Sequence, residues 1–349
     1  MDSKVNMSYI TLGGFVEVEK YKFLYFFIML IVYIIVICSN ATIICLIWMH
    51  QNLHEPMYIF TAALLCNSIL FSTVIYPKML LDFLSEMQVI TYSACLFQCF
   101  LYYAFSGSEF ILLAVMAYDR YVSICKPLQY PTIMRKSNIK RLLFFAWLFP
   151  AAQVSVPIAL NAEKNDICNF TLNGMFCNNL VNKLYCTMSG IVTVYGTIVL
   201  LNVTIFPLLF IVFTYIKIFV ITFRSCKKVR KKAAETCLPH LLVLINFSCL
   251  ITYEIVIVRI QFNLSDTVRL IMTLQLAIYH PLFNPIIYGL KMKEISKHLK
   301  RLFINVMLKL FCNLLLQWSS TVMACSHSWK KRSIYSFSQI FRKKLILKV

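Results

Sequence analysis

The residues of this chain best suited to do chemistry are an aspartate and an arginine, Asp119 and Arg120, in the segment Met116–Tyr130 (MAYDRYVSICKPLQY). They follow directly after the apolar run Phe110–Ala117. Ionisable side chains beside a long apolar helix are costly to bury, so they either reach water at the helix end or have a function there. The segment alone leaves both interpretations open: contact of the charges with lipid headgroups, or a charge pair with a task inside the protein.

The composition indicates that these charges belong to a membrane protein. Of 349 residues, 60% are hydrophobic and 14% are charged, and the mean hydropathy is +0.74. About 20 apolar residues in a helix span the hydrocarbon layer. The runs are continuous rather than alternating, which favours helices over a barrel, and the first is too long and too late for a cleaved signal peptide. We therefore predict an all-α membrane protein with seven spans: Phe23–Trp48, Met57–Leu81, Tyr92–Cys125, Leu142–Leu160, Ser189–Phe223, Cys237–Gln261 and Val268–Leu290.

The basic residues predict the orientation of these spans. Cytoplasmic loops carry an excess of Lys and Arg, so we expect residues 1–22 to be extracellular at the plasma membrane. The net charge of +20 then reflects topology and contact with the anionic leaflet of the lipid bilayer, with no nucleic acid as partner. The basic residues follow the third, fifth and seventh spans: Lys126, Arg135, Lys136, Lys140 and Arg141; Arg224, Lys227, Lys228, Arg230, Lys231 and Lys232; Lys291, Lys293, Lys297, Lys300 and Arg301.

Sequons and cysteines in the loops expected outside support this orientation. Asn6 and Asn169 each begin an N-glycosylation sequon. Four cysteines in an oxidising compartment suggest two bridges, for which the sequence alone allows three pairings. These cysteines are Cys95, Cys168, Cys177 and Cys186.

Four motifs in a fixed order give the chain a family resemblance. It resembles a rhodopsin-like G-protein-coupled receptor and, within that class, a vertebrate olfactory receptor. The forms LHEPMYIF and TCLPHL are closer to fish receptors than to mammalian ones. The resemblance runs from about Asn6 to Arg301 and implies the bridges Cys95–Cys177 and Cys168–Cys186. The motifs are LHEPMYIF (Leu53–Phe60), MAYDRYVSICKPLQY (Met116–Tyr130), KAAETCLPH (Lys232–His240) and PLFNPIIYGL (Pro281–Leu290).

The resemblance gives the Asp-Arg pair a role as an output switch. It implies that Arg120 binds Asp119 in the resting state and a G protein in the active state. Tyr215 and Tyr288 match tyrosines that close around this arginine on activation. Two alternative sets of partners for a partly buried guanidinium define two discrete states. Without the motifs around them, the two tyrosines would equally suit an interface belt.

Three more residues of the expected switch belong to the sixth and seventh spans. Pro285 removes a helical hydrogen bond and permits a kink, and we expect Asn284 to satisfy the freed carbonyls. His240 lies at the cytoplasmic end of the sixth span, which in the family moves outward to admit the G protein. Outside this context, Pro285 would be an ordinary membrane kink and His240 a packing histidine.

The ligand site is expected on the inner face of the third span. Residues three and four apart share a helix face, which aligns Tyr102, Ser106 and Glu109. Such a pocket is mostly apolar with a few hydroxyls and suits a small organic odorant, although the aliphatic residues would equally suit helix packing. With the matching positions of the fifth and sixth spans, the expected lining is Tyr102, Tyr103, Ser106, Gly107, Val199, Leu200, Val203, Ile251, Thr252 and Ile255.

Two positions depart from the family pattern. Ser68 stands where most rhodopsin-like receptors carry an aspartate that holds a sodium ion, which leaves Glu109 as the one acid near that point. Hard cations require several oxygen ligands, so we expect no metal there and regard Glu109 as an acid that can carry a proton. The segment Phe247–Cys249 replaces the Phe-Tyr-Gly of mammalian olfactory receptors.

The C-terminal residues 302–349 extend beyond the resemblance. Polar residues recur there every four positions in an apolar stretch, which predicts a short amphipathic helix on the inner leaflet. An extension without a selected function is the alternative. The receptor domain itself is expected over residues 23–301. The polar positions are Asn305, Lys309, Asn313 and Gln317.

The function predicted from these features is reception of a small odorant and activation of a stimulatory heterotrimeric G protein. A non-olfactory receptor of the same class and a seven-helix transporter are the alternatives, although a transporter would favour internal repeats that the sequence lacks. We expect no enzyme and no cofactor, because the chain has no nucleophile motif, paired carboxylates or metal-ligand spacing.

Overall fold

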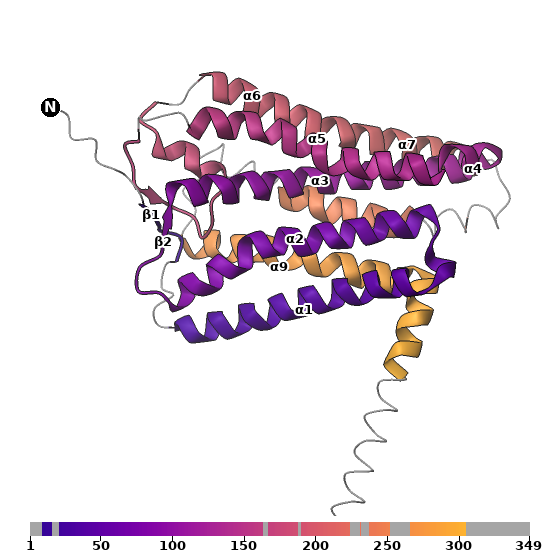
Figure 1. Ribbon diagram of the computed structural model, residues 1–349, viewed down its shortest axis with the longest axis horizontal. Coiled ribbons are helices and arrows are strands. Elements are labelled where there is room, and N and C mark those ends of the chain that lie inside the picture. The colour runs from indigo at the N-terminus through magenta and orange to yellow at the C-terminus, as the bar shows by residue number, and fades with distance from the viewer. Residues whose placement is uncertain are drawn as a thin grey trace, which may run out of the picture. The chain divides into compact units, whose positions relative to one another are not determined.

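The computed structural model describes residues 9–15, 21–162, 167–187, 190–223, 231, 237–251 and 266–304 (Figure 1). Structural statements below concern these residues. The chain divides into two compact units, Met1–Ser296 and Lys297–Val349. The first unit holds a bundle of long helices, and the second is helical through residue 304. The predicted amphipathic tail and the sequon at Asn6 lie outside the described residues.

The bundle consists of long apolar helices, as expected from the seven runs. Five spans in the described part of the chain are long and apolar enough to cross a membrane, with α6, η5 and α7 counted as one, and Cys237–Ile251 is a shorter apolar helix. The predicted all-α membrane bundle is confirmed. The helices are α1 (Lys22–Met49), α2 (Pro56–Leu84), α3 (Tyr92–Cys125), α5 (Lys136–Ala162), α6 (Gly190–Leu200), the π-helical turn η5 (Leu201–Ile205), α7 (Phe206–Phe223) and α9 (Asp266–Lys291).

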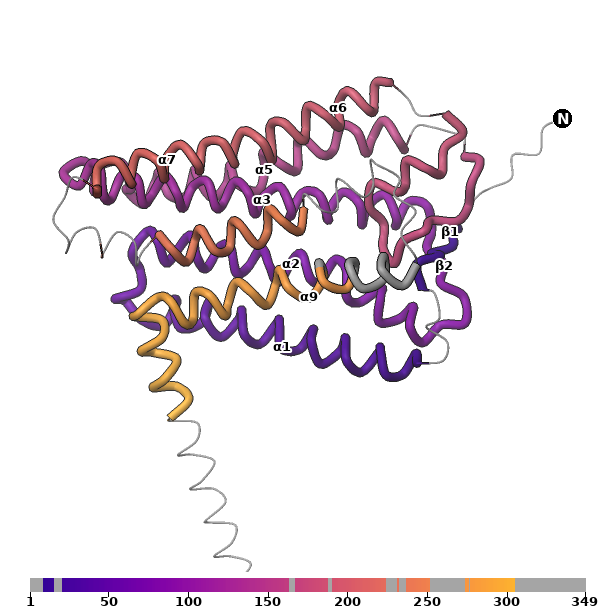
Figure 2. The backbone as a smooth tube through the Cα atoms, turned by 180° about the vertical axis from the view of Figure 1, so that it is seen from behind, coloured from indigo at the N-terminus to yellow at the C-terminus, as the bar shows by residue number. Residues whose placement is uncertain are grey.

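Helix α3 is the centre of the bundle and has the largest buried share among the five apolar spans, followed by α2. Within its most apolar window 72% of residues are buried, against 28% for α1 and 17% for α5. Figures 1 and 2 both show α3 between α5 and α2, and α3 contacts α2, α5 and α7. The outer helices expose large apolar side chains such as Phe23, Ile31 and Phe213, which is the pattern of a lipid-facing surface.

Side chains of α1 and α2 satisfy two carbonyl groups that prolines leave free in α9. Pro281 and Pro285 have no N–H, so the carbonyls four residues earlier, those of Ala277 and Pro281, lose their helical donors. Tyr76 donates to the Ala277 carbonyl at 3.2 Å, and Asn40 donates to the Pro281 carbonyl at 3.0 Å. The expectation that Asn284 would satisfy such carbonyls was wrong, because its amide bonds to Ser68 and Glu109 instead.

A small sheet and two disulfides close the end of the bundle that carries Cys95, which we call the disulfide end. Strand β1 (Tyr9–Leu12) pairs antiparallel with β2 (Val89–Thr91) and parallel with β3 (Thr171–Leu172). Disulfides join Cys95 to Cys177 and Cys168 to Cys186. Gly14 lies against the backbone of Gly174, where a Cβ would come within 2.5 Å of a backbone carbon. The loop with both disulfides is thereby fixed to the start of α3.

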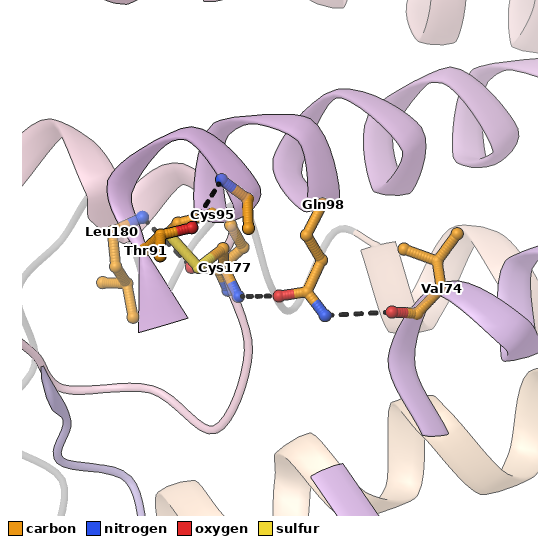
Figure 3. The surroundings of a disulfide bond; sticks show 8 residues. Val74, Thr91, Cys95, Gln98, Cys177 and Leu180 are labelled. Atoms are coloured by element: carbon orange, nitrogen blue, oxygen red, sulfur yellow. Dashed lines mark hydrogen bonds between the residues drawn. A yellow bond between two sulfur atoms is a disulfide. The ribbon is translucent and has the colours of Figure 1, made fainter. Parts of the chain in front are cut away.

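One glutamine connects this loop to α2, close to Pro77 (Figure 3). Gln98 of α3 accepts a hydrogen bond from the Cys177 backbone N–H at 3.0 Å. Its amide nitrogen donates to the Val74 carbonyl at 2.9 Å. Val74 lies three residues before Pro77, where a proline weakens the helical ladder. Gln98 therefore links α3, the bridged loop and α2 through a single side chain.

We expect Cys95→Ala to reduce the amount of receptor at the cell surface several-fold, and Cys177→Ala to do the same. The bridge closes a sequence separation of 82 residues, for which chain-entropy arguments give about 4 kcal/mol of stability. Surface immunolabelling of intact cells measures the effect, with Cys45→Ala as control, since Cys45 is a free and exposed cysteine. The double variant should be no worse than either single variant; an additive loss would contradict a bond between the two.

Candidate functional site

A buried polar network around Glu109 occupies the middle of the bundle. Glu109 lies on α3 with no exposed surface. Its Oε2 accepts from the Asn67 amide of α2 at 2.8 Å, and its Oε1 accepts from the Asn284 amide of α9 at 2.9 Å. The Asn284 amide also donates to the Ser68 hydroxyl oxygen at 2.8 Å. Three helices are thus joined through one carboxyl group.

The neighbours of the two asparagines fix the orientation of their amides. The Trp147 indole N–H of α5 can only donate, and it donates to Asn67 Oδ1 at 3.3 Å. The Ser68 hydroxyl donates to the Leu64 carbonyl at 3.1 Å, so its oxygen accepts from Asn284. Both asparagines therefore present N–H groups to Glu109, and both carboxyl oxygens act as acceptors.

His280 is the second ionisable group at this centre. Its Nε2 lies 3.7 Å from Glu109 Oε1, and the side chain is 1% exposed. Aromatic rings of Phe71 and Phe247 pack on the imidazole, with ring centroids 5.4 and 4.4 Å away. In the described part of the chain, His280 Nδ1 and Asn284 Oδ1 are buried without a hydrogen-bond partner. The sequence predicted Glu109 at this centre but not His280, Asn67 or Trp147.

The donor set at this centre does not fit the sodium ion that the family resemblance suggested. A hard cation requires several oxygen ligands free to point at it. Both Glu109 oxygens are bound by amide N–H groups, and the remaining neighbour is an imidazole nitrogen. Position 68 contributes a serine hydroxyl whose proton is used on a backbone carbonyl. The residues at this centre therefore do not form a sodium site of that kind.

The opposite end of α3, which we call the Arg120 end, holds the Asp-Arg pair in a closed form. Arg120 Nε donates to Asp119 Oδ2 at 2.9 Å, and Nη2 donates to the same oxygen. The Tyr130 hydroxyl, in α4 (Tyr130–Ile133), donates to Asp119 Oδ1 at 2.9 Å. Burial and the Asp119 charge raise the pKa of Tyr130 above its usual range, so the phenol remains a donor at neutral pH.

The tyrosines expected to receive Arg120 make no hydrogen bond to it in the described part of the chain. The Tyr288 hydroxyl is 3.4 Å from His240 Nδ1, and both side chains are buried. The Tyr215 hydroxyl and His240 Nε2 are buried without a hydrogen-bond partner in the described part of the chain. Because Arg120 bonds to Asp119 and these tyrosines do not, the Arg120 end has the geometry expected of a resting state.

On the disulfide side of Glu109, aromatic rings surround Tyr102. Its ring centroid lies 5.3 Å from Phe71, 4.9 Å from Tyr103 and 5.1 Å from Phe176 of the bridged loop. The Ser106 hydroxyl donates to the Tyr102 carbonyl at 2.8 Å within α3. Loop and helix thus meet on a shared aromatic surface, which is apolar with few polar groups.

Two of the expected lining residues contact each other closely. A Cβ added to Gly107 would lie 2.3 Å from a methyl carbon of Val203 and 2.9 Å from Pro150. Val203 lies in η5, a π-helical turn of the kind often found at functional sites. Gly107 therefore lets α3, α5 and the fifth span approach closely.

The other residues predicted to line the ligand site differ in their burial. Val199 and Leu200 are half-buried and Ile251 is buried, whereas Thr252 and Ile255 lie outside the described residues. Asn169, the second sequon residue, is exposed. Its side chain accepts from the Thr171 N–H at 3.0 Å.

These features define a class of protein. A bundle of membrane-crossing helices, with a buried Asp-Arg pair at one end and a loop bridged to α3 at the other, is a multi-pass receptor of the seven-helix type. Residues 29–306 match the olfactory receptor family. The chain belongs to that family, which is a family of receptors and not of enzymes.

Known relatives cover most of this chain. Olfactory receptor 2AT4 of Homo sapiens is 34% identical over 276 residues, which cover 78% of this chain and 85% of that receptor. Olfactory receptor 5H19 of Mus musculus is 35% identical, over 79% and 91%. Olfactory receptor-like protein COR2 of Gallus gallus is 33% identical, over 83% and 93%.

We expect Gly107→Ala to lower the thermal stability of the purified receptor, because the added methyl group would overlap Val203 and Pro150. Overpacking of this kind costs about 1–3 kcal/mol. Gly196→Ala is the matched control, since nothing lies within 4 Å of a Cβ at that position, and alanine is the better helix former. Equal unfolding midpoints for the two variants would contradict the close packing of α3 against η5 and α5.

Proposed function

We propose that this protein is an odorant receptor that binds a small organic molecule inside the bundle and activates a stimulatory heterotrimeric G protein. Membership of the olfactory receptor family supports this function. The observation that carries it is the Asp119–Arg120 pair: a guanidinium only 8% exposed, held by a neighbouring carboxylate at the end of the central helix. A buried cation of this kind is stable only with a partner.

The G protein would act as the alternative partner of the Arg120 end. When the helices separate there, Arg120 exchanges Asp119 for the G protein, and the hydroxyls of Tyr215 and Tyr288 become available to stabilise it. Tyr215 supports this, because its buried hydroxyl has no partner in the resting geometry of the described residues. A ligand shifts such an equilibrium by the difference between its affinities for the two states.

The proposed ligand site lies around Tyr102, between α3 and the bridged loop. The rings of Phe71 and Phe176 and the absence of charge on Tyr102 and Ser106 favour a mostly apolar ligand with one hydrogen-bonding group. Val199, Leu200 and Ile251 belong to the proposed lining, and so do Thr252 and Ile255. For Gly107 and Val203 the close contact supports a role in shaping the site rather than in touching the ligand.

We also propose an extracellular N-terminus at the plasma membrane. The disulfides at one end of the bundle, the exposed sequon residue Asn169 and the basic residues beyond α3 support it. The fish-type motifs LHEPMYIF and TCLPHL support a receptor subtype nearer to fish receptors. The segment 302–349 is proposed to lie on the inner leaflet.

We expect cells that carry the receptor and a cyclic-AMP reporter to respond to a member of a panel of volatile and water-soluble odorants. Arg120→Ala should reach the cell surface in normal amounts and lose most of this response, because the G protein loses its cationic contact. Arg141→Ala, at an exposed arginine of α5, is the control. Full signalling by Arg120→Ala would disprove the switch, and a response that persists in cells lacking the stimulatory G protein would disprove the coupling.

We expect Tyr130→Phe to raise signalling without ligand. The change removes the hydrogen bond to Asp119 Oδ1 and weakens the resting arrangement. A hydrogen bond to a charged group contributes about 1.5–3 kcal/mol. Only the share of this energy that is absent from the active state shifts the equilibrium, and a share of about 1.4 kcal/mol would raise basal cyclic AMP about tenfold. Tyr121→Phe, at the Arg120 end of α3, is the matched control. A basal level no different from the control would show that Tyr130 does not hold the resting state.

A further inference from the structure

Glu109 and His280 are an acid and an imidazole at the middle of the bundle, and the side chains that contact them in the described part of the chain are neutral. Asn67 and Ser68 face the pair from α2 and Asn284 from α9. The neutral indole of Trp147 on α5 contacts Asn67, and the ring of Phe247 covers His280. The next titratable side chain along α9, Tyr288, is turned to His240.

The hydrogen bonds around Glu109 restrict where a proton can be. Both carboxyl oxygens accept from amides whose orientation is fixed by Trp147 and Ser68. Oε1, which accepts from Asn284, also lies 3.7 Å from His280 Nε2. A carboxylate beside a neutral imidazole would leave one net negative charge buried at 0% exposure, and a buried charge without a counter-charge is strongly destabilising.

One additional proton removes this charge. On His280 it creates an imidazolium–carboxylate pair, and on Glu109 it creates a carboxylic acid beside a neutral imidazole. Both arrangements are neutral overall, and in both the proton lies between the same two side chains. Both Glu109 oxygens and the Ser68 hydroxyl oxygen already accept amide N–H groups, and Asn284 Oδ1 is the side-chain oxygen of this described group without a partner. One such oxygen is too few for a hard cation.

We propose that Glu109 and His280 together form a proton-binding site, in which one bound proton neutralises the centre of the bundle in place of a metal ion. The site lies one hydrogen bond from the motif that leads to Tyr288, because Asn284 donates to Glu109 Oε1. Hydrogen bonds to a carboxylate are about twice as strong as those to a neutral acid. The position of the proton therefore sets how firmly Asn284, and with it α9, is held against α3.

The test uses the full-length receptor, purified in lipid nanodiscs without ligand, and is therefore independent of the proposed function. Its unfolding midpoint is measured from about pH 5 to about pH 9 in sodium chloride and in choline chloride. Loss of the proton leaves a buried negative charge, so stability falls as the pH rises. We expect the wild-type midpoint to fall by roughly 2 °C per pH unit above about pH 6.5, where the unfolded imidazole releases its proton and the folded pair keeps its own, with the same curve in both salts.

Substitutions assign the proton to the pair. Glu109→Gln should flatten the pH dependence, because a neutral amide replaces the acid. His280→Gln leaves Glu109 as a lone buried acid, so its midpoint should still fall with pH, and the fall should begin at a lower pH than in the wild type. Glu86→Gln is the matched control at an exposed acid and should keep the wild-type slope. An unchanged curve in both site variants, or a flat wild-type curve, would overturn the proposal. So would a wild-type midpoint raised by sodium relative to choline, which needs no variant and would reveal a cation site.

Discussion

Backbone carbonyls that lose their donors inside a membrane must find new donors within the protein, and the packing of this bundle depends on that constraint. Hydrocarbon offers no water, so each unsatisfied group costs several kcal/mol, against about 0.6 kcal/mol for an average side-chain hydrogen bond between membrane helices. Pro281 and Pro285 create two such carbonyls in α9, and Tyr76 and Asn40 satisfy them. These two hydrogen bonds therefore determine how α1 and α2 are rotated against α9. Apolar packing alone would determine this poorly, because in lipid the apolar faces of a helix are nearly equivalent.

The polar centre is a consequence of that arrangement. Because Asn40 serves the carbonyl freed by Pro285, the amide of Asn284 is free to bind α2 and α3 through Ser68 and Glu109. A bundle in which Asn284 bonded to its own helix would leave Glu109 with one amide donor and a larger desolvation cost. The same segment continues to Tyr288, so the network at the middle and the contact with His240 share one rigid helix. The hydrogen bond that satisfies the carbonyl freed by Pro285 and those that hold Glu109 are therefore parts of one arrangement.

The sequence predicted the elements well and their partners poorly. The length of an apolar run is a local property, and it predicted the spans, including α3 as Tyr92–Cys125. Asn40, Asn67 and His280 carried a readable signal, since a polar residue inside an apolar run needs a partner. Which partner it finds depends on helix rotation and crossing, which are set by contacts as distant in sequence as Asn40 with Pro281. The same limit explains Gly107 and Val203: both were expected to line a ligand site, and the sequence could not show that they contact each other.

The constraint also explains why the two ends of the bundle differ in their capacity to change. At the disulfide end, Gln98 donates to the Val74 carbonyl of α2 and at the same time accepts from the buried Cys177 N–H of the bridged loop. Moving this loop would therefore expose backbone groups and strain a disulfide together. At the Arg120 end, the Tyr215 hydroxyl and His240 Nε2 lack partners in the described part of the chain. Rearrangement there breaks the hydrogen bonds of Arg120 to Asp119, but the Tyr215 hydroxyl and His240 Nε2 can gain partners in return. The free-energy cost of switching is therefore lower where Arg120 can exchange its partner.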